Sequence, residues 1–330
     1  MNEMNAFDFS NPWSHIENTS KGEYILSIGC SQKLVHSLYL GYDRQGRYVF
    51  LFKLPEGNKD VDNVLIPTIK GCSSEFFEFN SAFFFSLALG NKNDWHLFKL
   101  LCQELVSELE EHTKQENIYL LNILSNILNR CGRFFTRSKD TFSREKAVGL
   151  FGELYFLFKT ISPVIGLKEA IASWKGPMGC PQDFSVGNTI VEVKTTEAAH
   201  GRIVKISSLE QLCFPNSNGF LHVITINEAA SGGFRKSIVG LLDEIKEQCK
   251  VERVDTADLT TKLDLLGYTT TSAYAKKEYT VIAEDSYAVC DQFPRITPST
   301  LPQGVVDVKY SINLNICEQF KKTPNWTNHG

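Results

Sequence analysis

The chain has 330 residues, of which 42% are hydrophobic and 22% are charged, as in an ordinary soluble globular protein. Its formal net charge is −4, so it is not a basic protein overall. The nine cysteines are scattered and include no CxxC pair, which argues for reduced thiols and against a zinc ribbon or a disulfide framework. The first 13 residues lack the profile of a signal peptide, and the longest apolar run, residues 81–89, is about half of a membrane span. We therefore expect a cytoplasmic protein that does not enter a membrane.

The first elements along the chain are predicted strands followed by helices. Residues 24–28, 37–41 and 48–53 are rich in β-branched and aromatic side chains, which favour strands. Residues 95–112 repeat leucine with helical spacing, and a second helix is predicted over residues 118–128. We expect residues 1–115 to form a β-rich N-terminal domain with a closing helix. No group of residues in this domain is typical of a catalytic or metal-binding site. Recognition of DNA, binding of a partner protein and a structural role all remain open.

The segment 130–146 is locally basic. Residues 130–210 hold 12 basic and 8 acidic residues, whereas the whole chain is acidic. Such a distribution is typical of a protein that binds a phosphate backbone. The alternative is a solvated connection between two helices. The candidate DNA contacts in and after this segment are Arg133, Arg137, Lys139, Arg144 and Arg202.

The run 147–158 is apolar on every side, which predicts a buried helix. Gly149 and Gly152 would allow another backbone to approach this helix closely. Glu153 is the one residue in the run that is charged at neutral pH. A buried carboxylate is costly unless it is paired or bound to a metal, so Glu153 is a candidate site residue. A structural ion pair with an arginine is the alternative.

Residues 181–196 predict a β-hairpin that turns at Gly187-Asn188. Counting outward from the turn pairs Val186 with Thr189 and places Asp183 opposite Glu192, with Lys194 on the same side. The other side of the hairpin is apolar and suited to a core. Two facing carboxylates repel each other, and a hard cation such as Mg²⁺ would compensate. The alternative is a solvated face on which Lys194 neutralises Glu192.

Further helices and strands are predicted after the hairpin. Ser207 and Glu210 have the spacing of a capping box, so a helix is predicted to begin there, with Gln211 in its first turn. Its exposed N–H groups could hold a phosphate. A strand over 220–226, a helix over 234–249 and further strands between residues 279 and 312 follow.

Asp183, followed by Glu192-x-Lys194 on the next strand, resembles the PD-(D/E)XK nuclease superfamily. The chain departs from the pattern by placing Gln182 between Pro181 and Asp183, at a proline that is variable in the superfamily. The chain is further similar to a bacterial branch, the "PD-(D/E)XK motif proteins" of restriction and anti-phage loci, from about residue 145 to 320. This likeness is carried by Gly152-Glu153-Leu154, Trp174-x-Gly176-Pro177, Ser207-Ser208-Leu209-Glu210-Gln211-Leu212 and the proline-containing pattern over 293–305.

The resemblance implies an α/β fold with a restriction-endonuclease-like core, in the order αβββαβ around a mixed central sheet. We assign residues 116–270 to this nuclease core. Residues 271–330 are expected to form a C-terminal β extension packed on the core.

The resemblance also implies a Mg²⁺-dependent DNA endonuclease, with Mn²⁺ as a substitute ion. Asp183, Glu192 and the Val193 carbonyl would hold the metal, with Glu153 in direct or water-mediated support. Lys194 would orient or deprotonate the attacking water, or neutralise charge on the phosphate, and Gln211 would be a polar group close by. Double-stranded DNA is the expected partner, together with a methyltransferase and ATPase or helicase-like proteins of the same locus.

A second interpretation is a nuclease-fold subunit that binds DNA or scaffolds a defence complex without cutting. The intact Asp183, Glu192 and Lys194 favour the enzyme. A homodimer would suit symmetric double-strand cutting, although no residue pattern demands one.

Overall fold

The computed structural model describes residues 11–16, 24–29, 37–56, 61, 64–112, 115–132, 142–214, 217–228, 235–297, 300–305 and 308–326. The chain forms two compact units, Met1–Ser138 and Lys139–Gly330. The predicted boundary after residue 115 therefore lies inside the first unit. The reason is that the second helix, α2 (Asn117–Cys131), buries its leucines in the same core as the strands before it.

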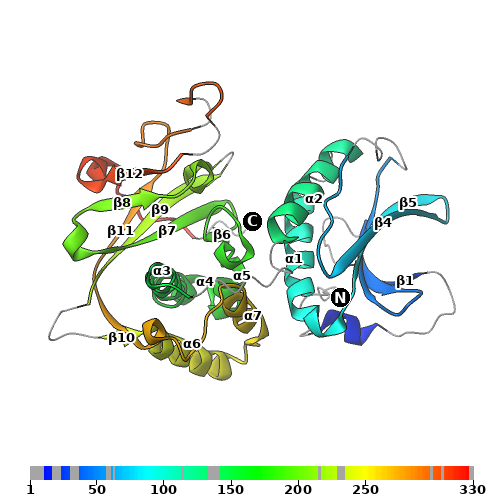
Figure 1. The fold of residues 1–330 in the computed structure, drawn as a ribbon, viewed down its shortest axis with the longest axis horizontal. Helices are drawn as coiled ribbons and strands as arrows, with labels where there is room; N and C mark the ends of the chain where they lie inside the picture. The colour runs from blue at the N-terminus through cyan, green and yellow to red at the C-terminus, as the bar shows by residue number, and fades with distance from the viewer. Residues whose placement is uncertain are drawn as a thin grey trace. The chain divides into compact units, whose positions relative to one another are not determined.

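The first unit is an antiparallel sheet covered by helices α1 (Trp95–Glu111) and α2 (Figure 1). Its strand order is β1-β2-β3-β5-β4. The strands are β1 (Tyr24–Gly29), β2 (Leu38–Asp43), β3 (Tyr48–Lys53), β4 (Cys72–Phe79) and β5 (Ala82–Leu89). Short 3₁₀ turns, η2 (Pro12–His15) and η4 (Lys92–Asp94), stand before β1 and α1. The predicted strands 24–28, 37–41 and 48–53 and both helices are confirmed within a few residues, whereas the β4–β5 hairpin was not predicted.

The second unit begins with a continuous helical stretch on one face of a sheet. It comprises α3 (Arg144–Tyr155), a π-helical segment η6 (Phe156–Ile161) and α4 (Ser162–Ile165), and α5 (Leu167–Ser173) follows. The Ser143 side chain caps α3 by accepting a hydrogen bond from the Lys146 N–H at 3.2 Å. Helices α6 (Ile238–Glu252) and α7 (Ala257–Leu265) complete this layer and share its apolar core.

The sheet of the second unit is mixed, as predicted. Its order is β10-β11-β9-β7-β6, and only β7 and β9 run parallel to each other. The strands are β6 (Phe184–Val186), β7 (Thr189–Glu197), β9 (Asn218–Asn227), β10 (Lys236–Ser237) and β11 (Glu278–Ala288). Strand β11 lies beside β9 within this sheet, so residues 278–288 belong to the core sheet and not to an extension packed upon it.

The opposite face of the sheet carries a second, smaller layer. Strands β8 (Ile203–Ile206) and β12 (Tyr310–Asn313) pair as an antiparallel ribbon. The ribbon packs with the 3₁₀ segments η9 (Leu209–Leu212) and η12 (Leu314–Phe320) around a separate apolar cluster. Further 3₁₀ turns are η7 (Gly176–Met178), η8 (Ala198–His200) and η10 (Ala273–Lys276).

This layer corrects two expectations. The third strand of the predicted αβββαβ order, β8, pairs with β12 instead of joining the central sheet. The helix predicted from Ser207 is only the short turn η9, and the Ser208 side chain makes no capping bond. Pro215 follows so closely that a longer helix would lose both a hydrogen bond and the room for its preceding turn.

The stretch Arg144–Ile165 is long and apolar enough to cross a membrane by length and composition alone. Core helices meet the same criterion. Here the stretch contributes Leu150, Phe151 and Leu154 to the core beneath the sheet, which accounts for its apolar sequence.

Candidate active site

The predicted hairpin forms with the predicted register. Phe184 pairs with Val191, Ser185 with Ile190 and Val186 with Thr189. Gly187 has a φ of +54°, a conformation that glycine adopts without the steric cost of a Cβ atom. The turn residues therefore fix which side chains of β6 and β7 share a face.

Asp183 stands where the regular ladder ends. Its backbone N–H donates to the Val191 carbonyl at 3.1 Å, so the pairing does not continue to Glu192 as predicted. Its carboxylate Oδ2 instead accepts a hydrogen bond from the Val193 N–H at 2.8 Å. In a strand the N–H and C=O of one residue point to the same side, so the Val193 carbonyl also faces Asp183.

Glu192 and Lys194 share one side of β7, as the spacing predicts. The Lys194 ammonium lies 2.7 Å from Glu192 Oε1, and the Glu192 side chain is only 1% exposed. The second oxygen, Glu192 Oε2, is buried and has no hydrogen-bond partner among the described residues. Unpartnered buried carboxylate oxygens are rare because their desolvation is costly, so this atom is suited to a cation, a water molecule or a proton.

Gln211 lies in the 3₁₀ turn η9, which follows β8, and its side chain contacts Lys194. Its Oε1 accepts hydrogen bonds from Lys194 Nζ at 3.1 Å and from the Ser207 N–H at 2.8 Å. Two side chains, those of Gln182 and Arg295, donate hydrogen bonds to backbone carbonyls in and next to the turn η9, which contains Gln211. Gln182 Nε2 donates to the carbonyls of Glu210 and of Cys213, the latter at 3.0 Å, and Arg295 Nη1 donates to the Leu212 carbonyl at 2.6 Å.

Glu153 reaches the same neighbourhood from α3. Its Oε2 accepts a hydrogen bond from the Trp174 indole Nε1 at 2.7 Å. The helix lies close to β7 because Gly152 has no side chain: a Cβ there would meet Thr195 Oγ1 at 1.8 Å. The close approach that the two glycines of this helix predicted is thus confirmed at Gly152.

Gly176 lies next to the carboxylates of Asp183 and Glu153. A Cβ at Gly176 would lie 2.7 Å from Asp183 Oδ1 and 3.3 Å from Glu153 Oε2. The backbone N–H groups of Lys175 and Gly176 both donate to the Asp183 carbonyl, at 2.6 and 3.1 Å. The segment between α5 and β6 therefore runs directly beside both acids.

Burial raises the pKa of all three carboxyl groups of the site. Burial raises the pKa of Asp183 to about 6, although the Lys194 charge and the Val193 N–H oppose the rise. Burial also raises the pKa of Glu192 well above its usual range, and the Asp183 charge adds to this. The pKa of Glu153 is raised by burial and by Asp183, against the Trp174 hydrogen bond. Burial lowers the pKa of Lys194, but the neighbouring Glu192 outweighs it and the net shift is upward.

A family model described as "Putative PD-(D/E)XK family member, (DUF4420)" matches residues 9–315, which is well over half of the chain. The chain belongs to this PD-(D/E)XK family. Membership indicates a nuclease-like α/β fold. No curated protein and no solved structure matches the chain.

PD-(D/E)XK nucleases typically use divalent metals. Within the described parts of the chain, no three His, Cys, Asp or Glu side chains form a ready metal-binding group. Lys194 occupies one oxygen of Glu192, and the Val193 N–H occupies one oxygen of Asp183. The donors nevertheless suit Mg²⁺, which prefers oxygen and commonly takes only one or two protein carboxylates. The unpartnered Glu192 Oε2 and the mutual repulsion of the acids are the features that a cation would relieve.

Of the basic residues predicted to contact DNA, the structure places Arg144 and Arg202. Arg133, Arg137 and Lys139 lie outside the described residues. Arg144 forms ion pairs with Glu197 and Glu228, each at 2.6 Å.

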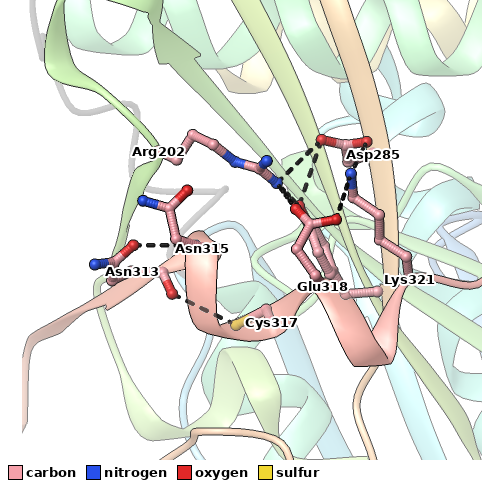
Figure 2. A network of polar contacts seen from close by, with 8 residues as sticks. Arg202, Asp285, Asn313, Asn315, Cys317, Glu318 and Lys321 are labelled. Carbon is pink, nitrogen blue, oxygen red and sulfur yellow. Dashed lines mark hydrogen bonds and ion pairs between the residues drawn. The ribbon is translucent and has the colours of Figure 1, made fainter.

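Arg202 is similarly engaged (Figure 2). It forms ion pairs with Glu318 and with Asp285, the latter at 3.6 Å, and it donates to the Tyr287 hydroxyl at 2.8 Å. Lys321 contacts the same two carboxylates at 3.0 and 3.1 Å. The guanidinium groups of Arg144 and Arg202 therefore have protein partners and tie distant segments of the second unit together.

Four residues of the site received no role from the sequence: Trp174, Gly176, Gln182 and Arg295. Trp174 and Gly176 were visible only as part of the family pattern, and Gln182 only as a departure from it. Their partners lie far away in the chain, as with Gln182 and Glu210, which are 28 positions apart, so no local pattern signals their roles.

Proposed function

We propose that this PD-(D/E)XK chain is a metal-dependent endonuclease that hydrolyses phosphodiester bonds of DNA. The observation that carries the proposal is the meeting of Asp183 and the Glu192–Lys194 pair at one hairpin, with the buried Glu192 Oε2 lacking a partner. Two acids can hold a cation that activates water, and an ammonium can stabilise the charge that develops on the phosphate.

Asp183 and Glu192 hold the cation in this proposal, with the Val193 carbonyl on the same side as Asp183. Glu153 assists directly or through a water molecule, and the Trp174 indole fixes its carboxylate. When bound, Mg²⁺ or Mn²⁺ polarises a phosphoryl oxygen and lowers the pKa of a coordinated water.

Lys194 acts as a hydrogen-bond donor through its ammonium group. An ammonium has three N–H bonds, and Lys194 directs two of them to Glu192 and Gln211. The third has no acceptor among the described residues and is free to reach the attacking water or a phosphate oxygen. Because Glu192 favours the ammonium form, orientation of the water and stabilisation of phosphate charge suit Lys194 better than proton abstraction.

A place in a restriction or anti-phage system is proposed from the likeness to the bacterial branch found in such loci. It implies action beside a methyltransferase and ATPase or helicase-like proteins. The substrate is double-stranded DNA in this proposal.

The decisive experiment is plasmid cleavage with Mg²⁺ or Mn²⁺ against EDTA, with and without the neighbouring gene products. Asp183→Ala and Lys194→Ala should abolish nicking and linearisation. Glu244→Gln is a matched control, because Glu244 is a half-buried glutamate bonded to Lys159 at 3.0 Å on the helix layer. RNA and modified DNA tested in parallel identify a different substrate. A wild-type protein that cuts none of these under any condition would overturn the proposal.

A DNA-binding subunit without catalytic activity is the second candidate. It is favoured by the contact of Lys194 with Glu192, which neutralises one of the acids without any metal. The same assay separates the two candidates, because an inert wild type that still shifts DNA on a gel would support the binding subunit.

A further inference from the structure

The ribbon formed by β8 and β12 has one exposed polar face. Lys205 pairs with Ser311 and Ile203 pairs with Asn313, and all four are exposed. The alternate residues, Val204, Ile206 and Ile312, are buried in the cluster beneath the ribbon. Lys309 is exposed, directly precedes β12 and continues the alternation from Ser311. The "ribbon face" comprises Ile203, Lys205, Lys309, Ser311 and Asn313.

The charge of the ribbon face is positive and uncompensated. Its five residues include two lysines and no carboxylate. Neither Lys205 nor Lys309 has an ion-pair partner within the described ranges. Arg144 and Arg202, by contrast, are each held by two carboxylates. In a chain whose net charge is −4, a face of this kind is suited to an anionic partner.

Ser311 and Asn313 of the ribbon face have side chains of the kind that contact nucleic acid. Asn313 Oδ1 accepts a hydrogen bond from the Asn315 N–H at 3.0 Å, at the end of β12 (Figure 2). Its amide nitrogen lacks a protein acceptor in the described structure and is available to an outside one. Hydroxyl and amide groups bind phosphate oxygens, sugars and base edges, and a two-stranded ribbon fits the major groove of DNA.

The strand that carries Lys205 leads directly to the candidate active site. Strand β8 ends at Ile206, and the N–H of the next residue, Ser207, donates to Gln211 Oε1 at 2.8 Å. The same oxygen accepts from Lys194 Nζ. The end of β8 is therefore joined to Lys194 through a single side chain, that of Gln211.

We propose that the ribbon face is the surface on which the second unit docks double-stranded DNA. Lys205 and Lys309 bind backbone phosphates, while Ser311 and Asn313 contact the groove or its edge. This inference rests on the proposed function, since it names the surface that presents the substrate to the hairpin.

The test is equilibrium binding of a fluorescent DNA duplex, three helical turns long, measured by anisotropy in EDTA so that no cleavage occurs. Lys205→Gln/Lys309→Gln is compared with the wild type over a series of salt concentrations. The control is Lys246→Gln/Lys276→Gln, which removes the same charge from two exposed lysines on α6 and η10. Lys205→Arg/Lys309→Arg keeps the charge, and melting temperatures verify that every variant is folded.

The expected result is a loss of affinity of at least about tenfold at moderate salt and a slope of log K against log salt that is shallower by about 2, because each phosphate contact contributes roughly 0.9. The control and the arginine variant should bind as the wild type does. If the wild type binds and the ribbon variant matches the control, the ribbon face is refuted while the proposed function stands. A wild type that binds no duplex in this assay would overturn this inference, while plasmid cleavage decides the proposed function separately.

Discussion

Gly152 offers the sharpest test of how the candidate site is built. A Cβ at this position would lie 1.8 Å from Thr195 Oγ1 and 3.1 Å from Thr195 Cβ, whereas ordinary contact begins at 3.4 Å. Gly152→Ala should therefore push α3 away from β7 or force the threonine into another rotamer. Because Glu153 is the next residue, the same shift would move its carboxylate from Trp174.

The magnitude follows from two opposing effects. Overpacking of a tight contact costs about 1–3 kcal/mol. Replacing glycine by alanine inside a helix returns about 0.5–1 kcal/mol. The net expectation is a loss of up to about 2.5 kcal/mol, which lowers the melting temperature of a unit of this size by up to about 10 °C.

The assay is thermal and urea unfolding of three single variants and one double variant. Gly149→Ala is the matched control, because its Cβ would meet nothing closer than Glu153 Oε1 at 3.9 Å. It should leave stability unchanged or raise it. Thr195→Ala removes the clashing oxygen, which has no hydrogen-bond partner among the described residues, so the double variant should recover most of the loss. A Gly152→Ala protein as stable as Gly149→Ala would refute the close contact of α3 with β7.

Three further predictions concern the site itself. Gly176→Ala should reduce metal-supported DNA cleavage by at least about tenfold with an intact fold, measured by initial rates and circular dichroism, because its Cβ would stand 2.7 Å from Asp183 Oδ1. Gln182→Leu should free the turn that presents Gln211 to Lys194, which lowers kcat with little change in KM and speeds amide exchange over residues 207–213; unchanged exchange would contradict it. Burial raises the pKa of Asp183 to about 6, above its unfolded value of about 3.9, so its stabilising contribution is complete at low pH and is lost as pH rises through 6. The rise in melting temperature that Mg²⁺ produces should accordingly be small near about pH 5 and grow above 6, and a pH-independent rise would count against Asp183 as a ligand.

Local patterns predicted the part of the site that is local in sequence. Gly187-Asn188 and the alternation around it fixed the register of β6 and β7, because a one-residue slip would turn the apolar side chains to solvent. The contact of Glu192 with Lys194 followed from a spacing of two residues. Glu153 was recognised because a charge within an apolar helix is costly.

The rest of the fold and of the candidate site depends on contacts between residues that are distant in the sequence. The β8–β12 pairing joins residues more than a hundred positions apart, and the ion pairs of Arg202 with Glu318 close the same long loop. The capping pattern at Ser207 misled because helix propensity is a weak signal and Pro215 follows within two turns. The hydrogen bond from Arg295 to the Leu212 carbonyl joins residues 83 positions apart, so no local sequence pattern predicts it.

The central claim is that the hairpin binds one divalent cation through Asp183 and Glu192. The most direct measurement is a Mn²⁺ titration followed by electron paramagnetic resonance, which reads metal binding without any substrate. The wild type should bind one ion per chain in a way that Glu192→Gln abolishes and the control Glu244→Gln preserves. A Glu192→Gln protein that binds Mn²⁺ as tightly as the wild type would contradict the account.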